Sequence, residues 1–409
     1  MKNYIIIISL LLICRVKGQL IDNSNDIETF EIESKFLKET QNVKVALPYG
    51  YHKSTKSYPI ILILDHQLMF PTMTAIVNQL SSTSRMPESI VVAITEGNKH
   101  RTYYAPDLYD NHKKRSYGYG NHQEEFKMFL EKEVFPKLAS TYRTVNFKTL
   151  IGFSPSSVFT LDIFCKQPKL FQAYIAIASG NIIGDGYVKN KNLIDAIESS
   201  LAHNSSHNAY LYVVSGGKDL NDHPDIKDNI TSFNQRLSPF ITNKFKAKAE
   251  IIDGEGHTDV LLPGLINAMD FIFPKERWVV DYIDIINTSG NAKENIDLFY
   301  NNLSQEYGFT IYPNMNRLYS MNCIKNIGNR LLSQKRITET IELYRYWTQL
   351  YPLSSTSHAY LGLALKVAGN KKESIKSYEK AIKIAKQESN PELLTYKKSL
   401  EELEQNIKK

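Results

Sequence analysis

The stretch "LIGFSPSS" contains a serine whose position suits a nucleophile. Ser154 follows an apolar, strand-like run and precedes a helix-like one, and Gly152 stands two residues before it. A sharp turn from strand to helix lifts a serine hydroxyl above the end of a sheet, and small residues suit it because the turn is tight. The motif alone is weak, because a turn serine that caps its helix has the same pattern.

Two further segments supply the partners that a serine nucleophile needs. His257 lies in the glycine-rich turn of "IIDGEGHTDV", and Asp219 lies in "VVSGGKDLND", each just after a strand-like run. A histidine acts as general base, a carboxylate orients it, and Ser, Asp, His is the chain order of α/β-hydrolases. Several other carboxylates lie close by in sequence and could take the role of the acid instead of Asp219. These are Asp222, Asp225, Asp253 and Glu255.

The elements that would position these residues alternate between strands and helices. From about residue 42 to 273, β-branched runs alternate with helical patterns, which indicates a mostly parallel sheet with helices on both faces. The predicted strands are "NVKVALP", "YPIILILD", "ESIVVAIT", "FKTLIGFS", "AYIAIAS", "AYLYVVSG" and "AKAEIIDG". Ligands of such sheets sit at the carboxyl ends of strands, so Ser154, Asp219 and His257 should meet at one edge.

After Trp278 the strand-like runs stop and helical periodicity continues to the end. Three residue pairs are thirty-four positions apart: Gly328 and Gly362, Ile341 and Ile375, Tyr344 and Tyr378. This period resembles a tetratricopeptide repeat, whose paired helices stack into an array. An ordinary helical bundle is the alternative. The sequence therefore predicts an α/β-hydrolase-like domain over 19–278, followed by an all-α tetratricopeptide-like repeat domain over 279–409.

The first eighteen residues have the pattern of a secretory signal peptide. One lysine precedes an apolar run from Ile5 to Cys14, and small residues stand near Gly18. We expect cleavage near Gly18-Gln19 and a periplasmic or secreted protein. No later stretch is apolar and long enough to span a bilayer. Removing this segment lowers the formal net charge from +6 to +3, which argues against a nucleic-acid partner.

Cysteine and histidine spacing predicts neither a disulfide framework nor a metal site. Cys165 and Cys323 are the cysteines that remain after the signal peptide, and they lie in different segments. His203 and His207 are four residues apart, but their polar neighbours are typical of a solvated loop. No zinc-type spacing occurs elsewhere.

Over about residues 42 to 273 the chain resembles the esterase family that includes esterase D and the ferric enterobactin esterases. The matching stretches are "VALPYGY" with "YPIILILD", "ESIVVAI" followed by Arg101, "FKMFLEKEVFPKLASTYRT", "LIGFSPSS", "LFQAYIAIAS" and "GEGHTDVLLPGLINAMDFIF". The resemblance implies a serine hydrolase that acts on small-molecule esters without a metal or organic cofactor. It also implies that Arg101 lies near the pocket.

Two positions depart from the pattern of that family. Pro155 follows the serine, where this fold ordinarily uses a backbone N–H as an oxyanion donor, and proline has none. In the loop Asp65-His66-Gln67, relatives usually carry glycine after the aspartate. His66 and Gln67 are therefore the candidate oxyanion-loop residues, with His66 either supplying a donor or blocking the hole.

Together these features predict a secreted or periplasmic serine carboxylic-ester hydrolase that acts on siderophore-type or other acyl esters. In this hypothesis Ser154 attacks the ester, His257 transfers the proton and Asp219 holds the imidazole. The alternative, favoured by Pro155, is an interaction protein with weak or no catalysis that binds a protein or peptide through its helical repeats.

Overall fold

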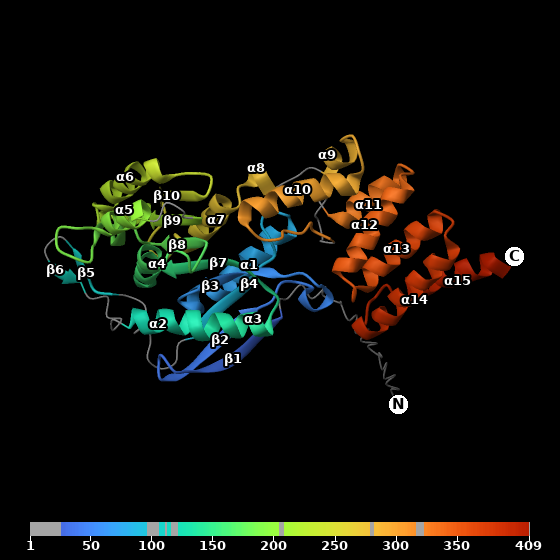
Figure 1. Ribbon diagram of the computed structural model, residues 1–409, viewed down its shortest axis with the longest axis horizontal. Coiled ribbons are helices and arrows are strands. Elements are labelled where there is room, and N and C mark those ends of the chain that lie inside the picture. Colours follow the sequence, from blue (N-terminus) through green and yellow to red (C-terminus); the bar gives the residue numbers. More distant parts are fainter. Residues whose placement is uncertain are drawn as a thin grey trace, which may run out of the picture.

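The computed structural model describes residues 26–95, 106–110, 113–115, 122–203, 208–278, 282–315 and 323–408. Its main sheet has eight strands in the order β1-β2-β4-β3-β7-β8-β9-β10 (Figure 1). Their bounds are β1 Ile27–Ser34, β2 Glu39–Ala46, β3 Tyr58–Ile63, β4 Ile90–Thr95, β7 Thr144–Phe153, β8 Ala173–Ile177, β9 Ala209–Gly216 and β10 Phe245–Ile252. The predicted signal peptide over 1–18 lies outside the described residues.

The sheet is mostly parallel, as the sequence predicts. The six strands from β4 to β10 in this order run parallel to one another, whereas β2 pairs antiparallel with both β4 and β1. Every residue of β3, β8 and β9 is buried, which is why these strands read as continuous apolar runs. All seven predicted strands are present, and β1 is an additional edge strand. A separate hairpin joins β5 Leu108–Asp110 to β6 Lys113–Arg115.

Helices cover both faces of the sheet. Residues of α1 His66–Ser82 and α7 Leu261–Ile272 belong to the hydrophobic cluster on one face. The cluster on the other face includes residues of α2 Gln123–Phe129, α4 Pro155–Lys166, α5 Leu193–His203 and α6 Ile226–Leu237. A π-helical turn over Leu130–Val134 joins α2 to α3 Phe135–Thr141. The apolar residues along this helix are buried: Phe126, Phe129, Leu130, Val134 and Leu138.

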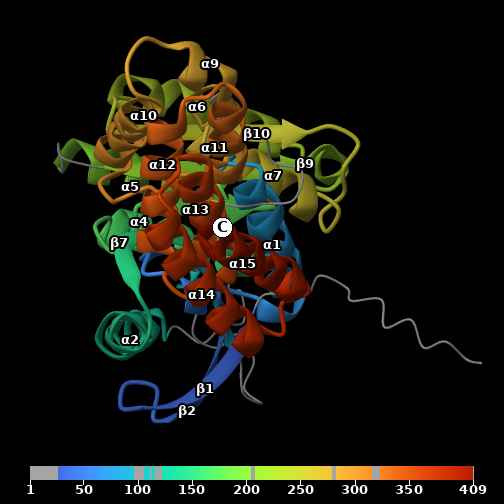
Figure 2. The ribbon, with the colours of Figure 1, turned by 90° about the vertical axis from the view of Figure 1, so that its right-hand side faces the viewer.

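A helical region follows the sheet, and its later part, coloured orange to red, lies at one end of the molecule (Figures 1 and 2). It begins with α8 Lys275–Trp278, α9 Tyr282–Asn287 and α10 Ala292–Tyr307. The rest consists of α11 Ile324–Ser333, α12 Ile337–Leu350, α13 Ser355–Val367, α14 Lys371–Glu388 and α15 Leu393–Lys408. The predicted change from α/β to all-helical structure is confirmed. Within the described ranges, no helix combines the length and apolar composition that crossing a bilayer requires.

The thirty-four-residue period corresponds to a contact that is made twice. A side chain added at Gly328 would meet the ring of Tyr344, and one added at Gly362 would meet the ring of Tyr378. Each glycine carbonyl also accepts a hydrogen bond from a hydroxyl of the following helix. The donors are Thr340 for the first pair at 3.4 Å and Ser374 for the second pair at 2.7 Å. Helix pairs α11–α12 and α13–α14 therefore pack in the same way.

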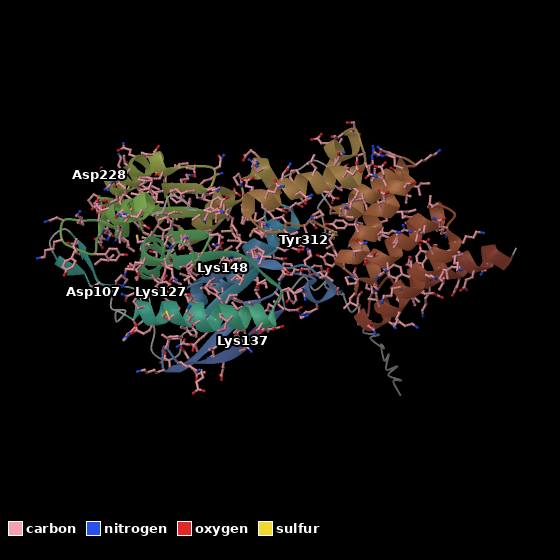
Figure 3. The ribbon with its side chains drawn as sticks, in the orientation of Figure 1. Asp107, Lys127, Lys137, Lys148, Asp228 and Tyr312 are labelled. Atoms are coloured by element: carbon pink, nitrogen blue, oxygen red, sulfur yellow. The ribbon has the colours of Figure 1, made fainter. Side chains whose placement is uncertain are left out.

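The helical region shares a hydrophobic core with the sheet. The rings of Phe147 in β7 and Phe273 after α7 lie 6.1 and 5.3 Å from the ring of Tyr307 in α10. The Tyr307 hydroxyl donates to the Ile272 carbonyl at 2.7 Å and accepts from the indole N–H of Trp278 at 3.0 Å. Farther along the chain, Tyr312 lies between the two regions (Figure 3). One core therefore continues past residue 278, the predicted end of the esterase-like domain.

We expect a chain that ends after Phe273 to be markedly less stable than one that ends after Met315. The shorter chain lacks Trp278 and Tyr307, so Phe147 and Phe273 lose their cover. Exposing two phenylalanine side chains costs roughly 3–6 kcal/mol, a large share of the stability of a typical domain. Urea unfolding of both fragments measures the difference. Equal midpoints would show that α8–α10 contribute nothing to the sheet-bearing part.

Candidate active site

Ser154 occupies a strained turn between β7 and α4. Its backbone has φ 51° and ψ −120°, a conformation that costs free energy for any residue with a side chain. The Ser154 N–H donates to the Ile177 carbonyl of β8 at 2.7 Å and fixes the turn against the sheet. At Gly152 an added Cβ would lie 2.6 Å from Thr160 Oγ1 and 2.7 Å from the Ser156 carbonyl oxygen, so only glycine fits. The strand, sharp turn and helix that a nucleophile elbow requires are all present.

The structure brings Ser154, His257 and Asp219 together at the carboxyl edge of the sheet. His257 lies between β10 and α7, and its Nε2 is 2.8 Å from Ser154 Oγ. Asp219 lies in the 3₁₀ turn Gly217–Asn221 after β9, and its Oδ2 is 3.3 Å from His257 Nδ1. The ring nitrogens of one histidine thus face a hydroxyl and a carboxylate, which is the arrangement that activates a serine.

Glycines allow the two loops that carry His257 and Asp219 to approach each other. An added Cβ at Gly216 would lie 2.6 Å from the Glu255 carbonyl oxygen, and the Lys218 N–H donates to that same oxygen at 2.9 Å. The Asp219 side chain is 12% exposed, whereas that of His257 is 48% exposed. The acid is therefore shielded while the imidazole faces solvent.

Two other acids of the Asp219 loop, Asp222 and Asp225, make different contacts. Among the described residues, the Asp219 carboxylate is the one within ion-pair distance of the His257 ring. Asp225 Oδ2 accepts from the Asn229 side chain at 3.0 Å. Asp222 donates its backbone N–H to the Asp219 carbonyl at 3.2 Å. The geometry therefore favours Asp219 over its neighbours as the partner of the imidazole.

The candidate oxyanion-loop residues begin α1. Pro155 is the first residue of α4, where its fixed φ suits the helix but where it offers no N–H. His66 and Gln67 are the first two residues of α1, and Gln67 is exposed.

Arg101 lies outside the described residues, as does His207. His203 ends α5, where its Nδ1 is 2.6 Å from the Ser199 carbonyl oxygen. Across the ranges that the structure describes, no cluster of three His, Cys, Asp or Glu side chains could hold a metal ion.

Sequence reasoning missed a set of buried hydroxyls around the elbow. Ser156 contacts Asp65, and Ser157 Oγ donates to the Ser154 carbonyl at 2.5 Å. Ser179 Oγ lies 2.5 Å from Ser157 Oγ. The sequence feature that could have revealed them is the pair of serines after Pro155, Ser156 and Ser157, because a buried helix ordinarily begins with apolar residues.

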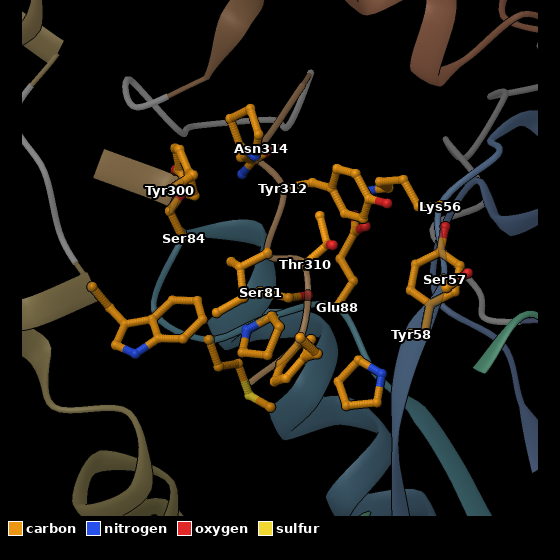
Figure 4. A pocket seen from close by; sticks show the side chains of 17 residues that line it. Lys56, Ser57, Tyr58, Ser81, Ser84, Glu88, Tyr300, Thr310, Tyr312 and Asn314 are labelled. Carbon is orange, nitrogen blue, oxygen red and sulfur yellow. The ribbon is translucent and has the colours of Figure 1, made fainter. Parts of the chain in front are cut away.

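A hollow of about 40 Å³ (Figure 4) lies between the sheet and the segment after α10, and Ser154, His257 and Asp219 are not among its lining residues. Tyr58 lines it at the start of β3, whereas Asp65 follows the other end of that strand. Buried Lys56 pairs there with Glu88, and its Nζ lies 4.9 Å from the ring centroid of Tyr351. Burial raises the pKa of the Tyr58 hydroxyl well above its ordinary value. This hollow is a junction between the sheet and the helical region.

Comparison with known proteins places the chain in a family. A family model described as "Putative esterase" matches residues 34–251, which is more than half of the chain. The protein belongs to this family of carboxylic ester hydrolases, which are serine hydrolases.

Individual relatives are similar at low identity. The ferri-bacillibactin esterase BesA of Bacillus subtilis (strain 168) is 24% identical over 224 residues, which are 50% of this chain and 75% of the relative. An IroE-like serine hydrolase from Shewanella oneidensis has a TM-score of 0.61 at 21% identity, over 78% of this chain and 98% of that one. An uncharacterised protein from Capnocytophaga ochracea has a TM-score of 0.54 at 15% identity, over 87% of this chain and 94% of that one. These likenesses confirm the predicted α/β-hydrolase fold.

Proposed function

We propose that the protein hydrolyses carboxylic esters with Ser154, His257 and Asp219 as its catalytic triad. The observation that carries this proposal is the pair of distances that joins them, 2.8 Å from Ser154 Oγ to His257 Nε2 and 3.3 Å from His257 Nδ1 to Asp219 Oδ2. The Ser154 oxygen attacks the ester carbonyl while His257 takes its proton and passes it to the leaving alcohol. Water then hydrolyses the acyl-enzyme, with His257 again as the base.

Siderophore-type esters are the substrate class that we propose. BesA carries the name of a ferri-bacillibactin esterase, and the 48% exposure of His257 leaves the imidazole open to a bulky substrate. The test is kcat/KM for p-nitrophenyl esters of increasing acyl length beside a catecholate trilactone. We expect the trilactone to be the better substrate. Hydrolysis of short acyl esters without any attack on the trilactone would point instead to polysaccharide-linked or other small acyl esters.

The second candidate function is a binding protein built on a hydrolase scaffold, and Pro155 is the observation that favours it. Losing one oxyanion donor lowers turnover by about 10²–10³ in other hydrolases. Labelling with a fluorophosphonate probe separates the two functions, because the probe modifies only an activated serine. Stoichiometric labelling at Ser154 supports the enzyme, and an unlabelled protein supports the binding role.

We expect Pro155→Ala to raise turnover on activated esters, by up to about 10² if the restored N–H aligns with the oxyanion. Alanine suits a helix start, although it gives up part of the rigidity of proline. The measurement is kcat on p-nitrophenyl acetate beside the wild type, with melting temperatures to confirm folding. Unchanged kcat in a folded variant would mean that the N–H of residue 155 does not face the reacting carbonyl.

We further propose that the chain is exported and that its helical region is a tetratricopeptide-like array that can bind a peptide or protein. The apolar segment from Ile5 to Cys14 supports export, and the repeated contacts at Gly328 and Gly362 support the array. N-terminal sequencing of the protein from the periplasm or medium tests the cleavage near Gly18-Gln19.

A further inference from the structure

A buried hydrogen bond joins the nucleophile turn to the start of α1. Ser156 is 2% exposed and Asp65 is 7% exposed. The Ser156 hydroxyl donates to Asp65 Oδ2 and accepts the Phe153 N–H at 2.8 Å. These residues are 91 positions apart in the chain, so the bond ties the β7–α4 turn to the β3–α1 loop.

The Asp65 carboxylate accepts this bond and does not cap its own helix. Asp65 precedes α1 in the left-handed conformation, with φ 51° and ψ 53°, and its carbonyl accepts the N–H groups of Leu68 and Met69 at 3.1 and 3.2 Å. An aspartate at this position ordinarily caps the helix by accepting a first-turn N–H with its side chain. The Asp65 side chain makes no such cap. The first N–H groups of α1, at His66 and Gln67, have no acceptor within the helix either.

The start of α1 is anchored beside the strand that carries the nucleophile. Ile63 of β3 pairs with Ile151 of β7, and the Leu64 N–H donates to the Ile151 carbonyl at 3.0 Å. Ser154 lies three residues after Ile151, and Ser156 is bonded to Asp65. Because Pro155 lacks an N–H, a tetrahedral intermediate on Ser154 needs another donor, and this loop follows the strand next to β7.

We propose that Asp65 and Ser156 are positioning residues for the oxyanion hole. Their hydrogen bond holds the Asp65 carboxylate away from α1 and presents the His66 and Gln67 N–H groups to the developing oxyanion. This inference rests on the proposed function, in which Ser154 forms an acyl-enzyme. Neither side chain touches the substrate, so each acts through the backbone that it orients.

The test compares Ser156→Ala with Ser215→Ala in the full chain. Ser215 is a matched control, because it is equally buried near the end of β9 and accepts the Gly180 N–H at 2.7 Å, while β7 and β8 separate its strand from β3, which leads into α1. We expect Ser156→Ala to lower kcat on a p-nitrophenyl ester by about 10–10² with little change in KM, as partial loss of oxyanion stabilisation would. The Ki of a trifluoromethyl ketone, which forms a tetrahedral adduct on the serine, should rise by the same factor.

Two variants at Asp65 separate positioning from general loss of structure. Asp65→Asn keeps an oxygen that accepts the Ser156 hydroxyl, so it should retain most of the wild-type kcat. If Ser156→Ala fails to fold because the buried Asp65 carboxylate loses the Ser156 hydroxyl, the double variant Asp65→Asn with Ser156→Ala removes the charge and should show the same kinetic loss.

The outcomes distinguish this inference from the function on which it rests. A wild-type protein that neither labels with fluorophosphonate nor hydrolyses any ester would overturn both. An active wild type whose Ser156→Ala variant and double variant match Ser215→Ala in kcat and in ketone Ki would overturn the positioning role alone.

Discussion

Ser154→Ala should leave a folded protein that has lost nearly all ester turnover, by about 10⁶ in kcat as for other serine nucleophiles. The substitution removes the oxygen that forms the acyl-enzyme in the proposed mechanism and leaves the turn intact. The Ser154 N–H bond to Ile177 belongs to the backbone, and alanine at φ 51° bears the same strain as serine. The measurement is kcat on p-nitrophenyl acetate, with fluorophosphonate labelling and a thermal melt on the same preparation.

Ser157→Ala is the matched control for that experiment. Ser157 belongs to the same motif and is fully buried, but its hydroxyl faces the Ser154 carbonyl and Ser179 rather than His257. This variant should still label with the probe. Turnover that persists in purified Ser154→Ala would remove the triad assignment, whatever the control does.

Much of the fold could be predicted because buried strands and amphipathic helices have strong periodic signals. The strand β1 was missed although "IETFEIES" alternates apolar and polar residues, since it lies outside the run of buried parallel strands. The sequence predicts that the esterase-like domain ends at residue 278, because the hydrophobic periodicity changes there. The hydrophobic core does not end at that residue, because the ring of Tyr307, which lies after residue 278, packs against Phe147 of the sheet.

The meeting of Ser154, Asp219 and His257 could be predicted because parallel strands deliver their following loops to one edge of the sheet. The Asp65–Ser156 hydrogen bond could not. It depends on the register between β3 and β7 and on the left-handed backbone of Asp65, and local sequence encodes neither. Sequence also left the acid open among several carboxylates in two loops, and only the folded loops separate Asp219 from them.

Asp219→Asn should lower turnover by about 10⁴ while leaving the fold intact. An asparagine amide donates to His257 Nδ1, so the ring proton moves to Nε2, which can then no longer accept the proton of Ser154. The small exposure of the Asp219 side chain, 12%, means that water is poorly placed to restore the correct tautomer. The measurement is kcat on p-nitrophenyl acetate beside Asp222→Asn and Glu255→Gln, which alter the neighbouring acids of the same two loops. We expect both controls to stay within tenfold of the wild type. A loss below tenfold in Asp219→Asn, together with a large loss in either control, would assign the orienting role to that neighbour.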